Sequence, residues 1–359
     1  MKLAGLLALL VLSASAVAAE IPRYEVDPAW PKPLPNHWVM GEASGVAVDA
    51  KDHIWVLQRP NSIRTGRKGA VCKAASLGGC DPAPPVLVFD QKGNLLRAWG
   101  GPGEGYEWPE REHGITIDYK GYVWLGGNGH QDGQFLKFTQ DGKFVLQIGK
   151  SGDQTNSEDP TRLGQPASAS VDPLTHQVFI ADGYFNHRII VFDADTGAYR
   201  RIWGAYGKRP TDLKLPIKNS ASPQFGNPVH CVKIAHDGLV YVCDRSNNRI
   251  QVFRKDGVFV RQIVLDGHAT SKSSPWDLAF WIDPKQRFLF NADGTGNEMS
   301  VVLRDSGKVV DRFGKAGARP GEFFGLHNVA IDSKGNIYTT EVDPGDRVQK
   351  FRHLKSISP

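Results

Sequence analysis

The stretch NPVHCVKIAHDGLVYVCDRSNNRIQVF, residues 227–253, decides the fold. It begins with a short strand rich in β-branched residues, continues through a His-Asp-Gly turn, and ends in further strands rich in aromatic and β-branched residues. This pattern predicts a β-hairpin followed by another strand. A histidine, His230, stands just before the first strand, and an arginine, Arg245, stands just after the second. The number of copies of this hairpin determines the architecture.

The same hairpin pattern occurs six times along the chain. The copies share an apolar–Asp core in the first strand, an Asp/Gly/Asn turn and an aromatic-rich second strand; they begin at Ser44, His113, Ala167, His230, Trp276 and His327. Most copies continue into a third strand and several into a fourth, at a period of roughly 45 to 70 residues. Four strands per repeat predict an all-β fold, a six-bladed β-propeller of four-stranded antiparallel blades.

The two ends of the repeat array are expected to pair. The last copy stops after its third strand, near Phe351, and RYEVDPAW at residues 23–30 precedes the first inner strand. This N-terminal segment can supply the missing outer strand, which would remove an open sheet edge. We therefore expect residues 20–359 to form a single propeller domain, because a chain of this length fits one domain when it is built from repeats.

The first 19 residues predict a secretory signal peptide. They contain one lysine, an apolar run and small residues suited to cleavage after Ala18 or Ala19. No later part of the sequence is apolar for long enough to span a bilayer. We expect a secreted or periplasmic protein, a monomer without a membrane partner. The formal net charge of +5 is spread evenly, which argues against a nucleic-acid partner.

The four cysteines fit an oxidising compartment. Cys72 and Cys80 bracket a short Gly-rich loop that a disulfide could close. Cys231 and Cys243 would face each other if the turn at residues 236–238 pairs the two strands symmetrically, which would allow a cross-strand disulfide. Neither pair has the spacing of a metal site, and both are interpreted as structural.

The blades resemble NHL repeats. VFIADGYFNHRIIVF at residues 178–192 and VYVCDRSNNRIQVF at residues 240–253 are similar to the repeat pattern of that propeller family. The resemblance covers essentially the whole chain after the predicted signal peptide. NHL propellers include binding scaffolds as well as enzymes, so the fold alone does not decide the function.

One aligned column of the repeats indicates a metal site. The copies carry histidine at His113, His230 and His327, in blades two, four and six. Alternate blades of a six-bladed ring are related by a threefold rotation, so these imidazoles would converge on the central axis. Three histidines with open positions are the ligand set of a catalytic Zn²⁺ or a similar ion. A lone histidine, by contrast, is more often a packed core residue.

Three further residues are expected at the same rim. The second strand of each hairpin runs antiparallel to the first, so it ends where the first begins. Arg245 and Arg59 occupy equivalent exits in blades four and one, and Tyr184 lies one step beyond that point in blade three. Singly, each would be interpreted as a polar loop tip. Around three imidazoles, they predict an anion-binding pocket that contains a base.

Several motifs also resemble the lyase domain of the peptidylglycine α-amidating enzymes. They are EHGITID at residues 112–118, LHNVAID at residues 326–332, and the two blade segments at residues 178–192 and 240–253. The resemblance implies cleavage of the C–N bond of a peptidyl-α-hydroxyglycine, a carbinolamide with a terminal carboxylate, into a peptide amide and glyoxylate. It also implies a zinc ion on the three histidines, a catalytic tyrosine at Tyr184 in D-G-Y-x-N-x-R-I, and arginines at Arg245 and Arg59.

The chain departs from the pattern of this family at a second cation site. The family places an aspartate after the last zinc histidine, where it contributes to a structural calcium together with backbone carbonyls. In this chain that residue is Asn328, so a calcium held by Val46, Ile115 and Asn328 is not carried over. Two alternatives to the lyase stay open: a non-catalytic NHL propeller that binds a protein or a peptidoglycan-like ligand, and a metal-dependent hydrolase on the same scaffold.

Overall fold

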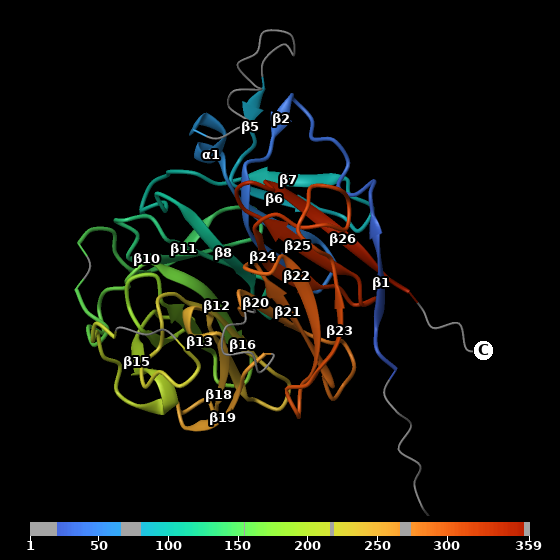
Figure 1. Cartoon of the computed structure of the whole chain (residues 1–359). Coiled ribbons are helices and arrows are strands. Elements are labelled where there is room, and N and C mark those ends of the chain that lie inside the picture. Colours follow the sequence, from blue (N-terminus) through green and yellow to red (C-terminus); the bar gives the residue numbers. More distant parts are fainter. Residues whose placement is uncertain (1–19, 66–79, 154, 216–218, 266–273, 355–359) are drawn as a thin grey trace, which may run out of the picture.

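The computed structural model describes residues 20–65, 80–153, 155–215, 219–265 and 274–354. Six four-stranded antiparallel sheets are arranged in a ring (Figure 1). The innermost strands of neighbouring sheets contact one another all the way around this ring. The six-bladed propeller that the repeats predict is therefore confirmed. The predicted signal peptide, residues 1–19, and Cys72 of the predicted Cys72–Cys80 pair lie outside the described residues.

Each blade contains four strands, which follow one another from the axis outwards. Blade one contains β3 (Glu42–Val48), β4 (Ile54–Arg59), β6 (Val86–Phe89) and β7 (Leu95–Trp99); blade two contains β8 (Glu112–Ile117), β9 (Val123–Gly127), β10 (Gln134–Phe138) and β11 (Phe144–Gly149); blade three contains β12 (Pro166–Asp172), β13 (Gln177–Asp182), β14 (Arg188–Asp193) and β15 (Tyr199–Trp203).

The second half of the ring repeats this order. Blade four contains β16 (Val229–Ile234), β17 (Val240–Asp244), β18 (Arg249–Phe253) and β19 (Phe259–Ile263); blade five contains β20 (Asp277–Phe280), β21 (Phe288–Asp293), β22 (Glu298–Leu303) and β23 (Val309–Phe313); blade six contains β24 (Leu326–Ile331), β25 (Ile337–Glu341), β26 (Arg347–Leu354) and β1 (Arg23–Asp27). Outside the blades, the helix α1 (Pro60–Thr65) follows β4, and β2 (Trp38–Val39) pairs with β5 (Asp81–Pro82).

The aspartate that ends the apolar–Asp motif explains where the hairpins of blades one and two turn. Asp49 accepts hydrogen bonds from the backbone N–H groups of Lys51 and His53, at 2.8 and 2.9 Å, and from the indole of Trp55 at 3.0 Å. In this way one carboxylate fixes the turn and the first aromatic residue of the next strand. Asp118 makes the same three kinds of contact in blade two, including a bond of 2.9 Å from Trp124.

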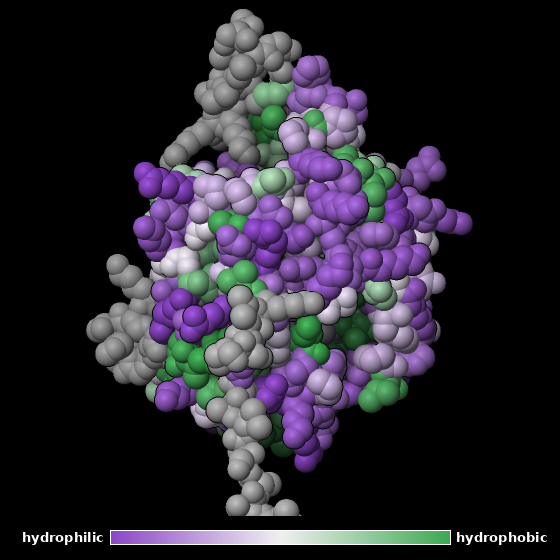
Figure 2. Space-filling view, turned by 90° about the vertical axis from the view of Figure 1, so that its right-hand side faces the viewer, coloured by the Kyte–Doolittle hydropathy of each residue, from purple (hydrophilic) through white to green (hydrophobic). Residues whose placement is uncertain are grey.

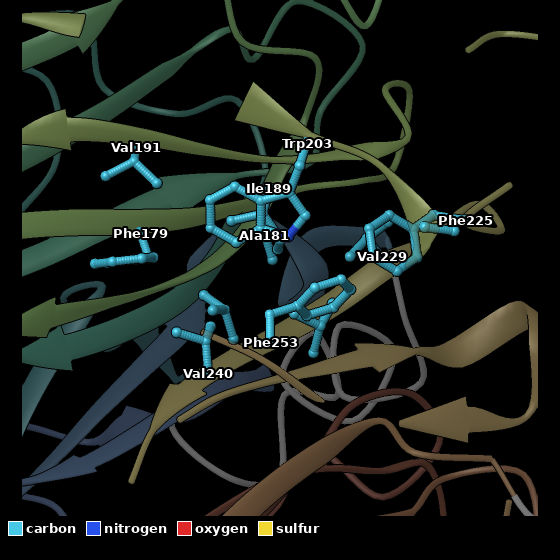
Figure 3. Close-up of a cluster of buried hydrophobic side chains, with 12 residues drawn as sticks. Phe179, Ala181, Ile189, Val191, Trp203, Phe225, Val229, Val240 and Phe253 are labelled. Atoms are coloured by element: carbon cyan, nitrogen blue, oxygen red, sulfur yellow. The ribbon is translucent and has the colours of Figure 1, made fainter. Parts of the chain in front are cut away.

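The hydrophobic core lies between adjacent blades. Figure 3 shows one such cluster, in which Trp203 of β15 packs at 6.1 Å from Phe179 of blade three and at 5.9 Å from Phe253 of blade four. Burying an aromatic or branched aliphatic side chain contributes about 1.5–3 kcal/mol. Packing of this kind therefore holds blades three and four together.

The N-terminal strand closes the ring as predicted. β1, blue in Figure 1, runs antiparallel along β26, drawn in red, with Arg23 opposite Leu354 and Asp27 opposite Lys350. Tyr24 of β1 packs against Phe290 and Phe313, at ring distances of 5.5 and 5.3 Å. The closing strand is therefore also a contact to blade five.

The cross-strand disulfide between Cys231 and Cys243 is present. The two residues face each other on β16 and β17, in the symmetrical register that the turn predicts. Among the described residues, no helix has the length and apolar character that crossing a bilayer requires. The face shown in Figure 2 is mostly hydrophilic, with hydrophobic side chains in small separate groups.

Candidate metal centre

A β-bulge at the start of the inner strand is found in the three hairpins that carry the histidines. The sequence places His230 just before the first strand, but in the structure it lies inside β16 as the extra residue of a bulge between Val229 and Cys231. His327 is the extra residue of the corresponding bulge in β24. In β8 the bulge follows His113. Bulges redirect side chains in this way near functional sites.

The three bulges bring the three imidazoles together. One ring nitrogen of each of His113, His230 and His327 lies within 4.8 Å of the corresponding nitrogens of the other two. The ring centres are 4.7–4.9 Å apart, and the side chains are buried. The convergence expected from the repeat alignment is therefore seen in the structure.

The outer nitrogen of each ring donates a hydrogen bond, which leaves the inner nitrogen without a proton. The Nδ1 atoms of His113 and His230 lie 2.7 and 2.5 Å from the backbone oxygens of Ala167 and Trp276, and Nδ1 of His327 lies 2.5 Å from Oδ1 of Asn328. These oxygens can only accept, so each Nδ1 carries the proton and each Nε2 keeps its lone pair.

Gly114 makes one of these contacts possible. Its φ angle is +71°, and a Cβ atom at this position would lie 2.2 Å from the backbone oxygen of Ala167, the acceptor of the His113 proton. A side chain on residue 114 would displace that oxygen. Glycine is therefore required here both by the backbone conformation and by the close approach of blade three.

Burial keeps all three imidazoles neutral. It holds the pKa of each of His113, His230 and His327 well below the usual range, and the nearby imidazoles and arginines lower it further. Neutral imidazole is the form that binds metals. The environment thus favours the ligand state of the three rings.

Tyr184 lies directly beside the three histidines. Its hydroxyl oxygen is 3.0 Å from Nε2 of His113 and 3.0 Å from Nε2 of His230. A phenol has one proton and can donate it to one of these nitrogens. The three buried Nε2 lone pairs therefore outnumber the one proton that Tyr184 can donate. Unpaired lone pairs of this kind are well suited to a cation, so the residues present fit a zinc ion.

Arg245 faces the same hydroxyl from blade four. Its Nη1 atom lies 3.3 Å from the Tyr184 oxygen, and its guanidinium carbon lies 3.2 Å from the ring centre of Trp276. The indole therefore supports the guanidinium from one face. Among the described residues, no carboxylate pairs with Arg245, so its fork can take an anion from outside.

Arg59 is near the site but is already held by other groups. It forms an ion pair with Glu42 and donates to the backbone oxygen of Glu112 at 2.8 Å and to Asn128 Oδ1 at 3.2 Å. It is 4% exposed. Its charge reaches the histidines and Tyr184, but its fork is already occupied by other acceptors.

The sequence did not reveal two groups that shape the centre. Trp276 occupies the aligned column in blade five, but nothing in its own blade indicates that it stacks on Arg245. Asn328 was noted for the aspartate it replaces, and the structure shows that it accepts the His327 proton. Its amide nitrogen donates to Asp277 at 3.0 Å. Because both ends of this amide are engaged, Asn328 does not fit the role of a calcium ligand.

Comparisons with known proteins find similarity to the two groups that the sequence resembles. A family model described as "NHL repeat" matches residues 229–253, the hairpin that carries His230 and Arg245. The chain is 26% identical over 340 residues to peptidyl-glycine alpha-amidating monooxygenase B of Xenopus laevis, an alignment that covers 92% of this chain and 36% of that protein. The chain thus spans little more than a third of that relative.

Relatives of similar length carry two kinds of name. The chain is 26% identical over 323 residues to a probable peptidyl-alpha-hydroxyglycine alpha-amidating lyase of Caenorhabditis elegans, which covers 88% of this chain and 83% of that protein. It is 28% identical over 346 residues to human NHL repeat-containing protein 3, covering 94% and 86%. The resemblance to NHL propellers and to amidating lyases is confirmed.

Solved structures share the fold at low identity. The crystal structure of virginiamycin B lyase from Staphylococcus aureus superposes with a TM-score of 0.50 at 14% identity, covering 88% of this chain and 85% of that one. At this identity the likeness shows the fold alone.

Proposed function

We propose that this protein is a zinc-dependent lyase that cleaves the C–N bond of a peptidyl-α-hydroxyglycine. One observation carries the proposal: three buried imidazoles direct unprotonated Nε2 atoms towards one another, and the Tyr184 hydroxyl lies 3.0 Å from two of them. The relatives named as amidating lyases support the choice of substrate class. A propeller that only binds a partner has no need of three converging imidazoles.

In this proposal His113, His230 and His327 hold the zinc ion. When bound, zinc supplies a Lewis acid that lowers the pKa of a coordinated hydroxyl and stabilises negative charge. The hydrogen bonds from each Nδ1 fix the direction of the rings before the ion arrives.

Arg245 and Tyr184 act on the substrate itself. The guanidinium of Arg245 pairs with the terminal carboxylate, for which its fork is well suited. This places the α-hydroxyl near Tyr184. In the proposal Tyr184 gives its own proton to water before the substrate binds, and the oxygen, 3.3 Å from the Arg245 guanidinium, then accepts the hydroxyl proton. The carbonyl of glyoxylate then forms as the C–N bond breaks, and the amide nitrogen takes the proton from Tyr184. The products are a peptide amide and glyoxylate, with Tyr184 restored.

The disulfide between Cys231 and Cys243 supports an exported location. Such bonds persist in the periplasm and outside the cell and are rare in the cytosol. Together with the predicted signal peptide, it leads us to place the lyase in a secreted or periplasmic compartment.

The test is metal analysis followed by an assay of glyoxylate release from an N-acyl α-hydroxyglycine. We expect about one zinc per chain, loss of release after chelation and recovery when zinc is returned. His230→Ala should lose most of the zinc and the activity while the propeller stays folded. His236→Ala, on the exposed turn of the same hairpin, is the matched control and should change neither.

Two results would contradict the proposal. A purified protein without a stoichiometric transition metal would favour the binding propeller. Metal at the site together with hydrolysis, but no glyoxylate release, would favour a metal-dependent hydrolase on the same scaffold.

A further inference from the structure

His327 has one support that the other two histidines lack. The Nδ1 atoms of His113 and His230 donate to backbone oxygens of the following blade, at Ala167 and Trp276. Backbone oxygens are fixed by the strand ladders around them. His327 interacts in the same way with the backbone of Ser44 in blade one, but its Nδ1 atom also donates to a side chain, Oδ1 of Asn328, at 2.5 Å. The direction of this third imidazole therefore depends in part on which way one amide points.

Asp277 determines the direction of that amide. Its Oδ2 atom lies 3.0 Å from Nδ2 of Asn328 and 3.1 Å from the backbone nitrogen of Val329. A carboxylate can only accept, so the amide nitrogen of Asn328 must face Asp277 and the amide oxygen must face His327. If the amide were reversed, an N–H group would be directed at the proton on Nδ1 and the imidazole would turn.

Lys233 compensates the charge of Asp277. The carboxylate is fully buried, and Nζ of Lys233 lies 3.0 Å from its Oδ1 atom. A buried carboxylate without a cation would be strongly destabilised. Lys233 belongs to β16, the strand that carries His230, and its side chain is 27% exposed. It lines the axial pocket together with Val46 and Ile115.

We infer that Lys233, Asp277 and Asn328 are positioning residues that direct His327 at the metal. The inference rests on the proposed zinc site and deepens it. The three residues come from blades four, five and six, so this support network also joins the last three blades at the axis.

The experiment measures zinc affinity by competition with a chromophoric chelator. Wild-type protein is measured first. Asp277→Asn and Lys233→Met should each weaken zinc binding about 10- to 100-fold, the range for outer-shell partners of a metal ligand. Asp305→Asn, an exposed aspartate of the same blade, is the control and should bind zinc as the wild type does. Circular dichroism checks that each variant is folded.

A double variant provides a rescue. Asp277→Asn combined with Asn328→Asp exchanges the acid and the amide, so that Nδ2 of the new amide can donate to the new carboxylate, which still accepts the His327 proton. We expect the double variant to bind zinc at least several-fold more tightly than Asp277→Asn alone. A ring-nitrogen NMR spectrum of the zinc-free protein should show the Nδ1–H form of His327 in the wild type and a changed signal in Asp277→Asn.

The outcomes separate this inference from the proposed function. If the wild type binds zinc and folded Lys233→Met binds it with the same affinity, the inference is overturned and the proposed lyase function stands. If Asp277→Asn does not fold, Lys233→Met decides. A wild-type protein that binds no zinc overturns both.

Discussion

The hydroxyl of Tyr184 contacts three other groups of the site. It lies between two imidazole nitrogens and the Arg245 guanidinium. Tyr184→Phe removes the hydroxyl and keeps the ring. We expect zinc content to be retained and turnover to fall about 10²- to 10⁴-fold, the usual contribution of a proton acceptor. Glyoxylate release and metal analysis of the same sample check this.

The control for Tyr184→Phe is Tyr199→Phe, at an exposed position of the outer strand of blade three. It should leave both quantities unchanged. Turnover of Tyr184→Phe at the wild-type rate would remove this residue from the mechanism.

Arg245 is expected to act on the substrate through its planar fork. Arg245→Lys keeps a positive charge but loses the paired donors and the flat contact with Trp276. We expect KM for an N-acyl α-hydroxyglycine to rise about ten-fold or more, because bidentate recognition of the carboxylate is lost. An N-acyl α-hydroxyglycinamide, which lacks the carboxylate, serves as the matched substrate. An equal loss with both substrates would contradict the assignment.

At the scale of elements, an acid that ends the second strand pairs with an arginine that begins the third. Asp182 pairs with Arg188, Asp244 with Arg249, and Glu341 with Arg347. Arg249 also donates to the backbone oxygens of Ser222 and Gln224, at 2.7 and 3.0 Å. This pair therefore holds the loop that leads into β16 and His230.

The pair Asp244–Arg249 can be tested by removing one partner. Both side chains are fully buried, and burial raises the pKa of Asp244 while Arg249 opposes that rise. Arg249→Met leaves the carboxylate unpaired, which costs about 3–5 kcal/mol of unfolding free energy. Urea unfolding measures this loss. Arg254→Met, from an exposed pair with Asp256, should unfold almost as the wild type does; a similar stability of both variants would contradict the role.

The elements also show what a sequence can predict. The blades, their closure and the histidine column follow from a repeated pattern, because each copy confirms the alignment of the others. The bulge at His230 could not be seen, since only Val229 precedes it in the strand, too short a stretch to show a break in the alternation of side chains. The contact between Lys233 and Asp277 joins two blades at the axis, and a pattern within single blades carries no information about it.

At the scale of the whole molecule, stability depends on the strand that closes the ring. Tyr24 of β1 packs against Phe290 and Phe313 of the neighbouring blade. Tyr24→Ala should lower the unfolding free energy by about 2–3 kcal/mol, somewhat less than for a fully buried aromatic residue. Thermal unfolding measures the change. Tyr199→Ala, at an exposed outer-strand position, should have little effect, and equal melting temperatures for the two variants would contradict a closing role.

The recurring bulge has a consequence for how such sites arise. Blades one and three have the same bulge at Ser44 and Ala167, whose side chains are not metal ligands. At both residues the pairing of the two strands is interrupted in the same way as at His230. A point mutation at such a position presents a new group to the central channel without rebuilding any loop. A lineage of these rings can therefore gain or lose a catalytic ion through a few codon changes while its architecture stays constant, so proteins of one shape can differ in whether they perform chemistry at all.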